Sequence, residues 1–125
     1  MPINSNNTVA LTKKVIITSS RPVTKEDFIN KISEISKNLV EYLKKNGCKE
    51  IGHIKFISTT DGEDYLQFSI HDINKKPKIQ GILRKTFEKI KLTLNIIEFG
   101  VGREKIDNKI DSEMKNIKDY FSNLQ

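Results

Sequence analysis

Two histidines are the side chains in this 125-residue chain whose chemistry is easiest to assess from the sequence. His53 and His71 lie on either side of an Asp-Gly pair, within flanking segments whose apolar residues alternate as in a β-hairpin. If residues whose numbers sum to 124 are paired, Ile54 lies opposite Ile70 and the two histidines oppose each other, with Cβ atoms roughly 5 Å apart. Two such imidazoles could hold one metal ion or share a proton, although a working metal site needs a third ligand.

The sequence offers no evident third ligand and no catalytic pair. Asp72 has the opposite strand parity, and Cys48 follows a predicted helix, whose C-terminal dipole disfavours a thiolate. Asp61, Glu63 and Asp64 cluster at the hairpin tip, where exposed carboxylates are poorly suited to general acid catalysis. We therefore expect no metal, no cofactor and no catalytic residue, and an enzyme is the least supported functional class.

A basic segment between residues 73 and 91 is the strongest candidate for binding an anion. The chain has 22 basic and 16 acidic residues, and this segment holds seven of the basic ones but only one acid, Glu88. The remaining 15 basic and 15 acidic residues cancel, so the net charge of +6 resides in this segment. Its basic residues are Lys75, Lys76, Lys78, Arg84, Lys85, Lys89 and Lys91. Such a cluster could neutralise the phosphates of a nucleic acid or another polyanion, although the chain has few arginines and few aromatic residues.

The segment Phe99 to Lys105 is a second candidate for binding an anion. A predicted strand, the glycines Gly100 and Gly102, and a helix start at Arg103 resemble half of a phosphate-binding turn. The third glycine of that motif is missing, and no further strand follows the helix. A sharp turn from strand to helix is the simpler interpretation.

Two amphipathic helices can be predicted from apolar residues spaced three and four positions apart. The first runs from Lys25 to Asn46 after Thr24 as N-cap, and the second runs from Arg103 to about Ser122. Strands are predicted over 8–19, with Arg21-Pro22 as its end, and over 51–59, 65–72 and 91–99. The stretch from Lys75 to Lys89 remains open between helix, irregular strand and loop.

The order of these elements predicts an α+β fold. We expect a two-layer sandwich, with an antiparallel sheet of four to five strands and both long helices on one face. A helix in the open stretch would give a ferredoxin-like order with an extra C-terminal helix. Residues 1–7 are expected to be disordered and residues 8–125 to form a single domain. The lack of a long apolar run argues against a membrane span, and the single cysteine favours the cytoplasm.

Two functional classes follow from these patterns. The first is a non-catalytic interaction domain, capable of forming a homodimer, in which Ile57, Tyr65 and Ile97 lie exposed on the outer sheet face as a partner surface. The alternative is a nucleic-acid or polyanion binder that uses the basic segment, with Arg103 as a further anion contact.

Overall fold

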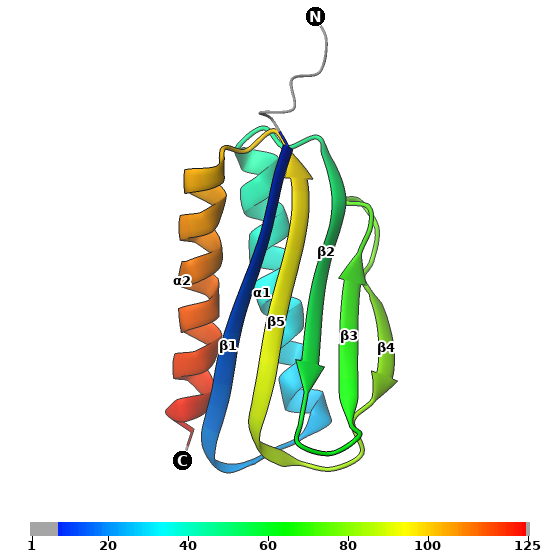
Figure 1. Ribbon diagram of the computed structural model, residues 1–125, viewed down its shortest axis with the longest axis vertical. Coiled ribbons are helices and arrows are strands. Elements are labelled where there is room, and N and C mark those ends of the chain that lie inside the picture. The colour runs from blue at the N-terminus through cyan, green and yellow to red at the C-terminus, as the bar shows by residue number, and fades with distance from the viewer. Residues whose placement is uncertain (1–7, 125) are drawn as a thin grey trace, which may run out of the picture.

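The fold is seen in a computed structural model that describes residues 8–124. Its elements are β1 (Thr8–Val23), α1 (Lys25–Lys45), β2 (Glu50–Thr59), β3 (Tyr65–Ile70), β4 (Lys78–Ile82), β5 (Phe87–Phe99) and α2 (Arg103–Ser122). The strands form one antiparallel sheet in the order β1-β5-β2-β3-β4, and both helices lie behind it in the view of Figure 1. The predicted α+β two-layer sandwich is thus confirmed, with five strands. The prediction about residues 1–7 lies outside the described range.

Helix α1 begins and ends where the sequence signals predict. The Thr24 hydroxyl accepts a hydrogen bond from the Asp27 amide at 3.1 Å, which satisfies one free N–H of the first turn. The chain leaves the helix through Gly47, whose φ of 93° suits glycine. One stripe of the helix is buried against the sheet; its apolar members are Phe28, Ile32, Ile35, Leu39 and Leu43.

Helix α2 spans the predicted residues and packs beside β1 (Figure 1). Its buried apolar stripe consists of Ile106, Ile110, Met114, Ile117 and Phe121. On the same face of the sheet, Lys13 of β1 forms ion pairs with Asp107 and Asp111 of α2. Lys13 therefore interrupts the apolar alternation of β1 because it meets acids of α2.

The hairpin of β2 and β3 has the predicted register, with Ile54 opposite Ile70 and Phe56 opposite Phe68. These four side chains face the helices and are buried. The rings of Phe56 and Phe68 meet edge to face, with centroids 6.0 Å apart. Burial of one face on each strand therefore fixed the register.

The segment left open in the sequence forms edge strand β4, a loop at residues 83–86 and the start of β5. A helix there is wrong, and the element order is not the ferredoxin-like one that a helix would have given. Gly81 has a φ of 105°, which a helix cannot contain, and the free edge of β3 pairs with β4 instead. Leu83 and Phe87 are buried as a helix would require, but they reach the core from the loop and from β5.

Strand β1 is longer than predicted. It continues through Arg21 and Pro22 to Val23, with a register irregularity between Thr18 and Val23 that accommodates the proline. Val23 is almost fully buried, and this burial stabilises the extension of the strand beyond its predicted end at Arg21-Pro22. None of the helices within residues 8–124 is both long enough and apolar enough to span a bilayer.

Candidate functional site

The side of the sheet opposite the helices, here called the outer face, is not covered by any described element (Figure 1). Cross-strand pairing arranges its side chains in rows. One row is Thr12, Asn95, Lys55, Ser69 and Lys78. The next is Lys14, Thr93, Ile57, Gln67 and Gln80, followed by Ile16, Lys91, Thr59, Tyr65 and Ile82. Thr18 and Lys89 complete the face toward the end of β1.

Five lysines from four strands gather on this face. These outer-face lysines are Lys14, Lys55, Lys78, Lys89 and Lys91. Four strand spacings separate β1 from β4, so the lysines extend over roughly 19 Å across the sheet. None of them has an ion-pair partner within residues 8–124.

Acidic residues are confined to the two ends of the outer face. Glu50 is the cross-strand neighbour of Phe99 at one end. Asp61, Glu63 and Glu88 line a hollow at the other end, between the β2–β3 hairpin and the β4–β5 loop. The rows in between hold no acid, so the positive charge of the lysines is not neutralised there.

Neutral polar side chains fill most of the space between the lysines. Thr12 donates a hydrogen bond to the Asn95 carbonyl oxygen Oδ1 at 2.8 Å, and Gln67 donates from Nε2 to the Ser69 hydroxyl at 3.1 Å. Hydroxyl and amide groups of this kind bind both phosphate oxygens and the edges of bases.

The predicted partner residues Ile57, Tyr65 and Ile97 do lie on the outer face, within its β2, β3 and β5 strands. Tyr65 is 47% exposed, while Ile57 and Ile97 are half-buried. Two apolar side chains that are more exposed than Ile57 and Ile97 share the row of Tyr65, since Ile16 and Ile82 are each about half exposed.

The structure divides the predicted basic segment into three groups. Lys78, Lys89 and Lys91 are outer-face lysines. Lys75 and Lys76 lie in the β3–β4 connection, at the opposite end of the sheet from the β4–β5 loop (Figure 1).

Arg84 and Lys85 form the third group, in the β4–β5 loop beside the acidic hairpin tip. Their backbone amides both donate to Asp64 Oδ2, at 2.8 and 3.3 Å, which ties the loop to the hairpin. Only part of the sequence cluster therefore contributes to one surface.

Sequence reasoning missed Lys14 and Lys55, which complete the outer-face group. Both lie far from residues 73–91 in the sequence. The hairpin register could have placed Lys55 on the same face as Ile57. Strand parity could have placed Lys14 on the face of β1 that Val15 does not share.

The two histidines flank the last cross-strand pair of β2 and β3, Ile54 with Ile70, near one end of the outer face. The pKa of His53 lies below its ordinary value, mainly because of partial burial and further because of the positive charges of Lys55 and His71. No group of three or more potential metal ligands occurs in the described part of the chain.

The turn Gly100-Val101-Gly102 before α2 is shaped by close packing of Gly100 against the backbone of Gly47 and Cys48. Gly100 has a φ of 125°, and a Cβ on it would lie 2.9 Å from the Gly47 carbonyl oxygen. The Val101 amide, which an anion would need in a phosphate-binding turn, donates instead to Glu98 Oε1 at 2.9 Å. Arg103 reaches back toward the Ala10 carbonyl oxygen at 3.5 Å.

Glu98 and Cys48 are buried near this turn. Glu98 is fully buried, and burial raises the pKa of its carboxyl group, an effect that the Val101 amide partly offsets. Burial also raises the pKa of the Cys48 thiol, which donates to the Glu50 carbonyl oxygen at 3.2 Å. A buried thiol with a raised pKa is a poor nucleophile.

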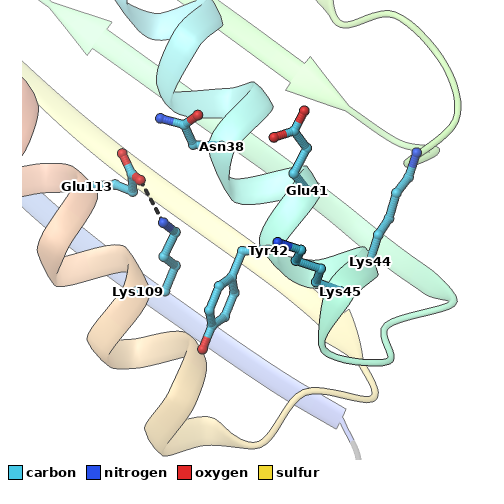
Figure 2. Close-up of a pocket in the computed structure, with 7 residues that line it drawn as sticks. All are labelled: Asn38, Glu41, Tyr42, Lys44, Lys45, Lys109 and Glu113. Carbon is cyan, nitrogen blue, oxygen red and sulfur yellow. Dashed lines mark ion pairs between the residues drawn. The ribbon is translucent and has the colours of Figure 1, made fainter.

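A hollow of about 600 Å³ lies between the two helices (Figure 2). Lys109 and Glu113 project into it from α2, and Asn38 and Tyr42 face them from α1. Lys109 Nζ lies 2.9 Å from Glu113 Oε1 and 5.4 Å from the centre of the Tyr42 ring. Because the lining mixes both signs of charge, the hollow has no clear ligand preference.

Comparison with known proteins identifies no family for this chain. No family model matches it, and no curated protein matches it. Two matching solved structures are Zn(II)-bound YjiA GTPase from E. coli and a Zn(II)-bound triple mutant of that GTPase. Each is 14% identical, with a TM-score of 0.41, and the match covers 81% of this chain but only 29% of the GTPase chain. This similarity is too low to support an argument about function.

Proposed function

We propose that this chain is a nucleic-acid-binding domain that holds a sugar–phosphate backbone on the outer face of its sheet. The observation that carries the proposal is the gathering of Lys14, Lys55, Lys78, Lys89 and Lys91 on one open face. Each lysine that neutralises a phosphate releases condensed counterions, and this release drives binding at low salt.

The neutral side chains of the face favour a nucleic acid over an anionic membrane. Insertion among lipids would take the polar groups of Thr93, Gln67 and Gln80 out of water without new hydrogen-bond partners. A nucleic acid offers both donors and acceptors to the same groups.

Charge also favours a nucleic acid over a second copy of the chain on this face. Two copies stacked face to face would place two sets of unpaired lysines together, with acids available only at the ends. The exposed row of Ile16, Tyr65 and Ile82 supports such a homodimer, so the mass of the free protein is part of the test.

The test is the salt dependence of binding to a short labelled oligonucleotide. Five phosphate contacts predict a slope of log K against log salt of roughly −3.5 for a single strand and −4.5 for a duplex. For a single strand this is a loss of affinity of roughly 100-fold between about 50 and 200 mM salt.

A matched pair of variants distinguishes the effect of the outer-face lysines on binding from the effect of the total charge. Lys55→Gln with Lys91→Gln removes two charges from the outer face, and Lys105→Gln with Lys115→Gln removes two from exposed positions on α2. We expect only the first pair to weaken binding and to flatten the slope, by roughly 1.4 for a single strand. Equal effects of both pairs, binding only to anionic vesicles, or a salt-insensitive dimer with no affinity for oligonucleotides would each overturn the proposal.

A further inference from the structure

We propose that Tyr65 stacks on an unpaired base, which makes the outer face a site for single-stranded nucleic acid; this inference rests on the proposed function. It specifies the substrate class and adds a contact that is independent of charge. Three observations carry it: the way the ring is held, the groups around it and the shape of the face.

The Tyr65 ring lies against Gly81 of the neighbouring strand. A Cβ built on Gly81 would come within 2.8 Å of Tyr65 Cε2 and within 2.5 Å of the Tyr65 carbonyl oxygen. Gly81 therefore leaves the space that the ring occupies, and the ring rests on β4 while remaining 47% exposed. An aromatic ring held in this way loses little side-chain freedom when a base stacks on it.

One lysine and several polar side chains lie near the ring in the same row and the next. Thr59 and Ile82 are its cross-strand neighbours, and Lys91 follows Thr59 in the same row, two strand spacings or roughly 10 Å from Tyr65. In the adjacent row, Gln67 and Gln80 carry amide groups that can hydrogen-bond to a base edge. A base on Tyr65 would thus have its backbone directed toward a lysine.

The shape of the face favours a single strand over a duplex. Most proteins that read a duplex insert a helix, a β-ribbon or an arm into a groove, and the outer face consists of strand positions within one sheet. Bases within a duplex are already stacked on both sides, so Tyr65 could reach only an unpaired one.

The experiment compares single-stranded DNA, single-stranded RNA and a DNA duplex of equal length at several salt concentrations. We expect Tyr65→Ala to weaken binding of both single strands by roughly 5- to 150-fold at every salt concentration, with an unchanged slope, since stacking releases no counterions. Tyr65→Phe should bind as the unmodified protein does, and duplex binding should be unaffected by either change. Tyr120→Ala is the matched control because Tyr120 is 45% exposed on α2, away from the outer face.

A second measurement uses the unmodified protein and so does not depend on the folding of a variant. Stacking of a base should shift the ring protons of Tyr65 upfield in NMR spectra on titration with a single strand, but not with a duplex. Salt-dependent binding that requires the outer-face lysines, without this shift and without a loss in Tyr65→Ala, would overturn the stacking proposal alone. Loss of the lysine dependence would instead overturn the proposed function.

Discussion

Glu98 yields the most direct stability prediction, because its carboxyl group is buried and one of its two oxygens has no hydrogen-bond partner within residues 8–124. The side chain is fully buried, Oε1 accepts from the Val101 amide at 2.9 Å, and Oε2 has no partner within residues 8–124. A buried acceptor without a partner costs about 1–3 kcal/mol, and more when it carries charge. Glu98→Gln keeps an acceptor for Val101 and removes the charge, although its amide nitrogen replaces Oε2 as the atom without a partner. We therefore expect it to relieve only the extra cost of burying a charge, and to raise the free energy of unfolding by about 1 kcal/mol once the pH is high enough to ionise Glu98.

The sign of the pH dependence follows from the raised pKa of Glu98. Below the ordinary value of 4.5 the carboxyl group is protonated in both the folded and unfolded states, so it adds no pH dependence. As pH rises above 4.5 the unfolded state ionises first, and the protein loses stability until the folded-state pKa is passed. The advantage of Glu98→Gln should therefore grow with pH across this window and then level off.

Urea unfolding of both proteins at a series of pH values measures this difference. The slopes of the unfolding transitions should agree, because the surface exposed on unfolding is the same. A difference that is constant with pH, or a variant that is less stable at high pH than at low pH relative to the unmodified protein, would refute the reasoning.

Three further predictions follow from other positions. Gly100→Ala should reduce the free energy of unfolding by about 1–3 kcal/mol because of its positive φ and blocked Cβ position. Gly102→Ala, with φ of −62° and open space, should reduce it less, by about 0.5–1 kcal/mol, because alanine is a poorer N-cap than glycine. Binding of an oligonucleotide should raise the pKa of His53 in an NMR titration, and the affinity should rise as the pH falls through that pKa. A pKa that does not move would place the ligand elsewhere. Lys109→Met should destabilise the fold by about 1–3 kcal/mol in urea unfolding, because it leaves the buried Glu113 carboxylate without its ion-pair partner. The double variant with Glu113→Leu should recover most of that loss.

Local patterns in the sequence were enough to predict the two helices and the β2–β3 register. The stripe from Phe28 to Leu43 has the period of a helix, and the alternation around Phe56 and Phe68 allows one register that buries both rings. Strand β4 could not be predicted in this way. Leu83 and Phe87 are spaced as in a helix, and their burial depends on how the loop meets the rest of the core.

The outer face was predictable only in part, because it is assembled by strand order. The hairpin register placed Ile57 and Tyr65 on one face from the sequence alone. Lys14 and Lys91 lie in adjacent rows only because β1 pairs with β5. No local pattern specifies this pairing, which joins segments about 80 residues apart. A cluster of basic residues in the sequence was therefore a poor guide to the cluster of basic residues in space.

The position of β1 at the edge of the sheet has a consequence for synthesis of the chain. Among the described strands β1 pairs with β5 alone, and its first residue, Thr8, lies opposite Phe99. At translation rates of about 5–20 residues per second, the 91 residues from Val9 through Phe99 take roughly 5–18 s to make. During that interval the β2–β3 hairpin can already close, since its pairing is local, while the apolar residues of β1 have no strand to join. Among the described strands, β1 is thus the one that depends longest on staying soluble before its pairing partner exists.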